Sequence, residues 1–166
     1  MEDLNSLEDL FHHQLRDIYN AEQQLIKSLP MMAENSSNRE LENAFREHLE
    51  ETVAQKQRLD EIGESLGINL TGETCHATQG LIKEAEEFIS KNPDPAVLDA
   101  GIIADAQRIE HYEIAAYGTA VAYAESLGHN EAAKKLQMTL DEETAADITL
   151  NEIAIKKVNP SAKTGL

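Results

Sequence analysis

The chain has 166 residues, of which 31 are acidic and 14 basic, giving a formal net charge of −17. This charge argues against a nucleic-acid partner, because phosphate binding needs clustered Lys and Arg. No stretch approaches the roughly 18 consecutive apolar residues of a membrane span, and the acidic start MEDLNSLEDLF does not resemble a signal peptide. The single cysteine excludes an internal disulfide framework. We therefore expect a cytoplasmic protein that binds neither nucleic acid nor membrane.

The composition also favours an all-α fold. Aromatic residues make up only 4% of the chain, whereas Ala, Leu, Glu, Gln and Lys are plentiful. These are helix-forming residues, and the β-branched and aromatic runs typical of sheets are scarce.

The first expected helix begins after Ser6, a suitable N-cap with Asp9 three residues later. Pro30 should kink this helix or end its regular part, and the helix should stop before Ser36. Its apolar stripe includes one acidic residue and consists of Leu7, Phe11, Leu15, Ile18, Glu22, Leu25 and Leu29.

The second expected helix runs from about Arg39 to Leu66 and stops at Gly67. Residues 67–95 then form a long connection with a short helix near Leu81–Ile89. A third long helix should begin at Pro95, capped by Asp94, and stop at Gly128. The fourth begins near Asn130 and fades into the polar end VNPSAKTGL.

Short, long and short connections predict two helical hairpins joined by one crossover. We therefore expect an all-α, ferritin-like four-helix bundle over residues 1–157, with a short extra helix in the long crossover. Residues 158–166 should form a flexible tail. The alternative fold is an up-down bundle without a crossover, in which residues 67–95 make an excursion at one end.

Acidic residues interrupt the apolar stripes of all four long helices. The phrase HLEETVAQ (48–55) is partly repeated as LDEETAAD (140–147), and each phrase places carboxylates close to the apolar face. A buried carboxylate without a partner is costly, and several converging carboxylates repel one another. The stripe acids are Glu22, Glu51, Glu110, Glu113, Glu143 and Asp147.

Basic partners or shared protons could neutralise these acids in a polar core, but the basic residues fall mostly on the helix flanks. We favour a metal pair, because carboxylates are hard oxygen ligands that suit iron or manganese. The spacing supports a single level in the bundle. Glu22 lies 14 residues before Ser36 and Glu51 lies 13 after Asn38, while Glu113 and Glu143 each lie 15 residues from Gly128.

Four phrases carry a family resemblance: LRDIYNAEQQL (15–25), HLEETVAQ (48–55), IEHYEIAAYGT (109–119) and LDEETAAD (140–147). With them the chain resembles the ferritin-like superfamily of carboxylate-bridged di-iron bundles. Within it, the chain looks like the YciF/YciE-type family of bacterial stress proteins (DUF892). The resemblance covers residues 4–155 or so.

Ferritin-like proteins place one Glu on the first and third helices and Glu-x-x-His on the second and fourth. The resemblance therefore implies Glu22 and Glu51 as ligands in one hairpin, and Glu143 with Glu113 or Glu110 in the other. This chain departs from the pattern at the two histidine positions, which are occupied by Ala54 and Ala146. The substitutes within reach are Gln55, Asp147 and His48. Three tyrosines near the site could hydrogen-bond a carboxylate, namely Tyr19, Tyr112 and Tyr117.

The resemblance implies a dinuclear iron protein, with manganese as the alternative metal, that acts on a small oxidant such as oxygen or peroxide in a stress response. An oxidase or peroxidase-like activity is its concrete form. The competing hypothesis is a non-enzymatic stress or interaction protein with weak or vestigial metal binding, which the missing histidines favour. Family precedent, with an exposed stripe on long helices, predicts a homodimer.

Overall fold

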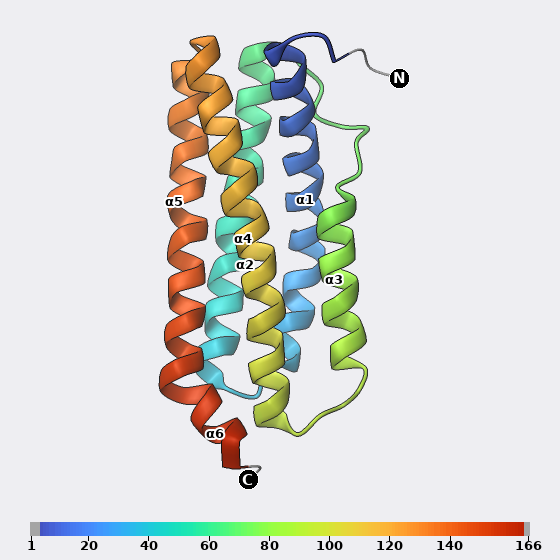
Figure 1. Ribbon diagram of the computed structural model, residues 1–166, viewed down its shortest axis with the longest axis vertical. Helices are drawn as coiled ribbons and strands as arrows, with labels where there is room; N and C mark the ends of the chain where they lie inside the picture. Colours follow the sequence, from blue (N-terminus) through green and yellow to red (C-terminus); the bar gives the residue numbers. More distant parts are fainter. Residues whose placement is uncertain (1–3, 165–166) are drawn as a thin grey trace.

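The computed structural model describes residues 4–164, which form helices and no strands (Figure 1). The sequence prediction of an all-α fold is confirmed. The helices are, in chain order, α1 (Leu7–Asn35), α2 (Arg39–Leu66), α3 (His76–Ile89), α4 (Pro95–Leu127), α5 (Asn130–Ile153), a π-helical turn (Ala154–Val158) and α6 (Asn159–Thr164).

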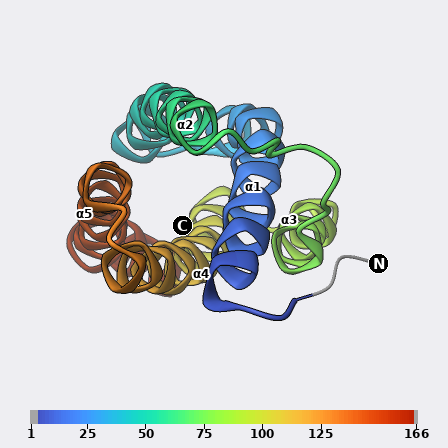
Figure 2. The ribbon, with the colours of Figure 1, turned by 90° about the horizontal axis from the view of Figure 1, so that it is seen from above.

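The four long helices form a bundle in which each packs against two others. Helix α1 contacts α2 and α4, and α5 contacts the same two helices from the opposite corner (Figure 2). Helix α3 lies outside this square, against α1 and α4. It runs back along the bundle, so α2 and α4 point the same way (Figure 1). The single crossover is therefore present, and the alternative without one is wrong.

The helix ends follow their local sequence signals. The Ser6 side chain accepts a hydrogen bond from the backbone of Asp9 at 3.1 Å, and Asn38 caps α2 in the same way. Gly67 and Gly128 end α2 and α4 with φ angles of 68° and 80°, a region that glycine adopts without steric cost. Pro30 does not end α1, which continues to Asn35.

The crossover helix begins at His76, five residues earlier than the periodicity predicts. Its start is anchored by side chains of α1. Asn20 Oδ1 accepts a hydrogen bond from the Cys75 backbone at 2.9 Å, and Gln24 Nε2 donates to the Cys75 carbonyl at 3.0 Å. These long-range contacts order a segment whose own sequence is rich in turn-forming residues.

The bundle does not end at residue 157. Val158 is only 2% exposed and packs with buried residues of the other helices, and the helical backbone continues to Thr164. The described helical backbone thus extends beyond residue 157, and the flexibility of the tail stays a prediction. Residues 165–166 lie outside the described part of the chain.

The apolar core is divided into two clusters along the bundle axis. One contains Phe11, Leu15 and Tyr117, and the other contains Leu25, Phe45 and Ile102. Twelve polar or charged side chains of residues 4–164 are buried. Those that interrupt the apolar stripes of the long helices lie between the two clusters. This polar layer contains the candidate site.

Candidate metal centre

The polar layer occupies stripe positions that would otherwise hold leucine. Apart from Gly63, the buried residues of α2 follow a four-three spacing, namely Leu41, Phe45, His48, Thr52, Gln55, Leu59 and Ile62. On α5, Glu143 lies seven residues from both Leu136 and Leu150, which are also buried. Four-three and seven-residue spacings keep side chains on one helix face. Glu22 on α1 and Glu110 and Glu113 on α4 are buried in the same way.

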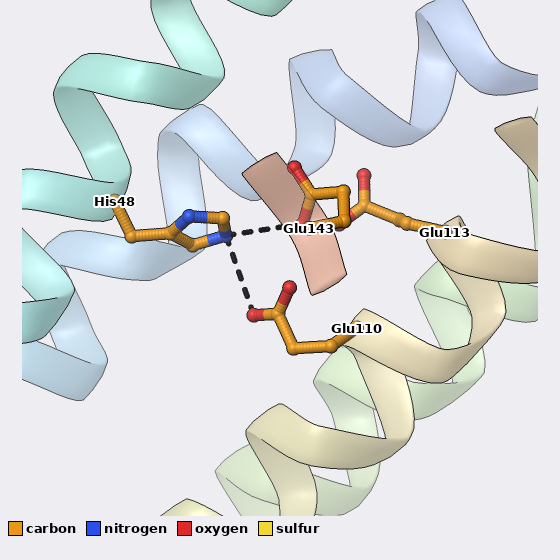
Figure 3. A group of neighbouring side chains, drawn as sticks. All are labelled: His48, Glu110, Glu113 and Glu143. Atoms are coloured by element: carbon orange, nitrogen blue, oxygen red, sulfur yellow. Dashed lines mark ion pairs between the residues drawn. The ribbon is translucent and has the colours of Figure 1, made fainter. Parts of the chain in front are cut away.

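Four side chains from three helices converge at the centre of this layer (Figure 3). They are His48, Glu110, Glu113 and Glu143, and we call them the central cluster. Each offers one ligand atom, and these atoms all lie within 4.8 Å of one another. His48 Nε2 is 3.3 Å from Glu110 Oε1 and 3.6 Å from Glu143 Oε2.

Glu22 and Gln55 flank the central cluster and are as deeply buried as its members. The Tyr117 hydroxyl donates a hydrogen bond to Glu22 Oε1, as the sequence analysis allowed for one of the tyrosines. Gln55 Nε2 donates to Glu143 Oε1 and, at 3.1 Å, to Glu142 Oε2. Glu22 and Glu143 therefore each accept a hydrogen bond on one oxygen from a neutral side chain.

The remaining oxygens of these carboxylates have no hydrogen-bond donor among residues 4–164. Both oxygens of Glu113 are in this state, together with Glu22 Oε2, Glu110 Oε2 and Glu143 Oε2. Such oxygens lose their hydration without compensation, which costs several kcal/mol for a charged group. A divalent cation is the partner that carboxylate and imidazole donors take in proteins. The donor set therefore fits a metal ion.

Burial and mutual repulsion raise the pKa of three of these carboxyl groups. Burial raises the pKa of Glu22 to about 8, against the hydrogen bond from Tyr117. Burial, with the neighbouring carboxylates, raises the pKa of Glu113 and that of Glu143 well above the ordinary value. Without a cation, the site therefore holds protons at neutral pH.

Inside the central cluster His48 pairs with Glu110 and Glu143, and Glu110 is the nearer of the two partners. Burial alone would lower the pKa of His48, but Glu110 raises it well above the ordinary value. Burial works against ionisation of Glu110, and the contact with His48 still lowers the pKa of that carboxyl. One positive charge thus compensates one of the buried carboxylates and leaves the others to protons or to a metal.

Glu51 does not join the central cluster, although the sequence analysis placed it among the metal ligands. Its side chain is 49% exposed, and its Oε2 lies 3.4 Å from His48 Nδ1. His48 occupies the inward position instead. Successive residues of a helix differ by about 100° in direction, so Glu51 points away from the face that carries its buried neighbour Thr52.

Asp147 also lies outside the central cluster, at the edge between α4 and α5. Its Oδ1 accepts a hydrogen bond from Gln107 Nε2 at 2.9 Å and lies 3.4 Å from His111 Nε2. The side chain is 21% exposed. The structure therefore gives Asp147 partners of its own and does not bring it to the buried carboxylates.

The repeated phrase consequently does not mark two equivalent halves of a site. Glu51 and Glu143 align in the repeat, but the first is exposed and the second is fully buried. The following residues show the reverse, because Thr52 is buried and Thr144 is exposed. The two copies thus present helix faces that differ by one residue, and Glu51 and Glu143 do not occupy equivalent positions in the described structure.

An ion pair beside the site was missed by the sequence analysis. Arg58 donates to both carboxylate oxygens of Glu142, at 2.7 and 2.6 Å, and to Thr139 Oγ1 at 2.9 Å. It connects α2 to α5 next to Gln55. The pairing joins residues 84 positions apart, and the only hint in the sequence is that Glu142 precedes the stripe residue Glu143.

Comparison with known proteins places this geometry in a family. Residues 6–163 match the family described as a domain of unknown function, DUF892. The chain belongs to the DUF892 family. It is 46% identical over 161 residues to protein YciF of Escherichia coli K12, covering 96% of this chain and 97% of YciF.

Solved structures of similar proteins have the same fold. The crystal structure of the E. coli stress protein YciF superposes with a TM-score of 0.91 at 46% identity, covering 94% of this chain and 99% of that one. YcfI from Rhodopseudomonas palustris gives 0.88 at 50% identity over 90% and 96%. A protein from Xanthomonas campestris pv. campestris, 21% identical with a TM-score of 0.76 over 96% and 98%, shares the fold.

The apolar segments of this DUF892 chain pack in the core of the bundle. Among the helices formed by residues 4–164, none combines the length and the hydropathy that crossing a lipid bilayer would require.

Proposed function

We propose that this protein is a ferritin-like metalloprotein that binds a dinuclear iron centre, with manganese as the alternative metal, inside its bundle. The observation that carries the proposal is the set of five buried carboxylate oxygens for which residues 4–164 provide no hydrogen-bond donor. Four-helix bundles of the ferritin-like class build such centres from carboxylates and imidazoles on facing helices. Similarity to a stress protein supports a role in the stress response.

The central cluster would hold one ion through the imidazole of His48 and the carboxylates of Glu110, Glu113 and Glu143. Glu22, held by Tyr117, would complete a second position with the free oxygens of Glu113 and Glu143. Iron in such a donor set supplies electron exchange with oxygen or peroxide, and carboxylate donors suit manganese equally.

The surrounding residues would orient the ligands. A metal-binding imidazole commonly donates its other N–H to a carboxylate, which fixes the tautomer and the ring orientation. Glu51 Oε2, at 3.4 Å from His48 Nδ1, is placed for this role. Gln55 holds one oxygen of Glu143 and leaves the other free, and Tyr117 does the same for Glu22. Glu51 and Gln55, which the sequence pattern places among the metal ligands, would thus orient the ligands without contacting the metal.

A second candidate is a non-enzymatic stress protein with weak metal binding. It is favoured by the composition of the central cluster, which contains one imidazole, whereas ferritin-like centres use Glu-x-x-His on two helices. Ala54 and Ala146 occupy the positions where those two histidines would stand.

Metal content tests the proposal directly. Metal-free protein is loaded anaerobically with ferrous iron, desalted and measured by elemental analysis. We expect about two ions per chain in the wild type, as in two-metal sites, and none in the double variant Glu113→Gln with Glu143→Gln. The control is Glu131→Gln with Glu152→Gln, which changes two exposed residues of α5 that pair with lysines on the surface.

The control should load like the wild type. A single ion per chain would contradict the dinuclear form, and metal retained by the Glu113→Gln/Glu143→Gln variant would locate the binding elsewhere. A folded wild type that takes up no metal would contradict the proposal and leave the non-enzymatic alternative.

A further inference from the structure

A small cavity between α2 and α5 connects the central cluster to the surface. Its volume is about 110 Å³, and its lining includes His48 and Glu110, which are 6% and 2% exposed. Glu47 and Ala145, at the other end of the lining, are exposed residues. The cavity therefore spans the distance from solvent to the buried ligands.

Alanines keep this cavity open. Ala44 on α2 and both Ala145 and Ala146 on α5 contribute to its walls. Ala146 follows Glu143 by three residues, so both lie on neighbouring parts of one helix face. A longer side chain at position 146 would occupy the space in front of the central cluster. Ala146 cannot ligate a metal, but its small side chain leaves the central cluster accessible from the surface.

Carboxylates line the cavity from its outer end to its inner end. Glu47 and Glu51 lie at the exposed end, and Glu110 Oε2 is buried at the inner end without a donor among residues 4–164. Glu142 also lines the cavity, but Arg58 neutralises it. The uncompensated negative charges of the lining are therefore those of Glu47 and Glu51 at its surface end, and they attract cations and repel anions.

The size of the cavity constrains what can pass. The space of about 110 Å³ admits molecules of the size of water. A hydrated divalent ion must lose waters to bind the buried carboxylates. It would have to exchange waters for carboxylate oxygens as it moves inward, and Glu51 and then Glu110 are placed to provide them.

We infer that the α2–α5 cavity is the route by which divalent metal ions reach the central cluster, and that Glu47 and Glu51 guide them into it. This inference rests on the metal site proposed above. It assigns a role in loading to residues that make no contact with the bound metal. It also predicts that loading rate and metal content can be changed separately.

The test measures the rate at which metal-free protein takes up manganous ion, with a chromogenic chelator reporting the metal that remains free. The Ala146→Leu variant should load at least about tenfold more slowly, because the ion must then wait for local opening of the helices. Its metal content at equilibrium should equal that of the wild type. Ala122→Leu, the same change at an exposed position of α4, should load at the wild-type rate.

The charge at the cavity mouth provides a second, independent variant. Glu47→Gln should slow loading several-fold at low salt, and the difference should disappear near 1 M salt, where the Debye length falls to about 3 Å. The Glu47→Gln variant still tests the inference if Ala146→Leu does not fold or binds less metal at equilibrium. Glu131→Gln, an exposed residue of α5 that does not line the cavity, is its control.

The inference is overturned if folded Ala146→Leu, or Glu47→Gln at low salt, loads as fast as the wild type. These results leave the proposed function intact, because the wild type still binds metal. A wild type that takes up no metal overturns both proposals together.

Discussion

Manganous ion should raise the melting temperature of the wild-type protein by about 5–10 °C. At a free-ion concentration of about 100 times Kd, binding to the folded state alone contributes about 2.7 kcal/mol. For a chain of this size each kcal/mol corresponds to roughly 2–4 °C. The measurement is thermal unfolding followed by circular dichroism, on metal-free protein with manganous ion or with chelator.

The melting temperature of the variant Glu113→Gln with Glu143→Gln should not depend on metal. The variant should lose the metal-dependent rise, because a neutral amide oxygen is a much weaker ligand for a divalent cation than a carboxylate is. Its metal-free form should be more stable than metal-free wild type by at least about 1 kcal/mol near pH 8, since one pKa unit corresponds to about 1.4 kcal/mol. If the variant is less stable than the wild type both with and without metal, these carboxylates support the fold rather than bind metal.

The stability of the metal-free protein should fall as the pH rises from about 4.5 to about 8. In this window the buried carboxyl groups keep their protons in the folded state, whereas their unfolded counterparts have lost them. The rise in the pKa of Glu22 from 4.5 to about 8 alone corresponds to about 5 kcal/mol. Glu113 and Glu143 act in the same direction.

The two members of the internal ion pair affect different parts of the pH range. His48, whose folded pKa is raised, adds stability that is present below pH 6.5 and is lost as the pH rises through that higher value. Glu110, whose folded pKa is lowered, adds stability above 4.5 that is lost only in stronger acid. Neither reverses the expected decline between pH 4.5 and 8.

Urea unfolding at several pH values in the presence of chelator measures this dependence. The Glu113→Gln/Glu143→Gln variant should decline less steeply, which separates the buried groups from surface charge. Saturating metal should oppose the decline, because binding displaces protons and becomes tighter as the pH rises. Metal-free stability that is constant or increasing from pH 5 to 8 would show that the carboxyl groups are not desolvated as described.

Much of this architecture could be predicted from local sequence. Serine and asparagine caps, glycine stops and the apolar spacing gave the four long helices within a few residues. Glu22, Glu110, Glu113 and Glu143 stand at stripe positions, and all four are buried. These features depend on helix geometry and on the cost of burying charge, both of which operate within a single helix.

The incorrect or missing predictions are of two kinds. One assigned the buried position of a helix to the neighbouring residue, and the others concern contacts between helices. Glu51 and Thr52 both seemed compatible with the stripe, but the seven-residue spacing of Phe45, Thr52 and Leu59 admits Thr52 and excludes Glu51. The matching series of His48, Gln55 and Ile62 identifies His48 as an inward residue. The pairing of Arg58 with Glu142 and the early start of α3 depend on tertiary contacts, which no local pattern contains.

The central claim is that His48, Glu110, Glu113 and Glu143 bind a metal ion, and an anomalous difference map of crystals grown with manganous ion tests it most directly. We predict a strong peak about 2.0–2.3 Å from His48 Nε2 and from oxygens of these glutamates. A second peak should lie about 3.5–4 Å away on the side of Glu22. An ordered cluster that shows no peak there, with manganese bound only at surface carboxylates, would contradict the account.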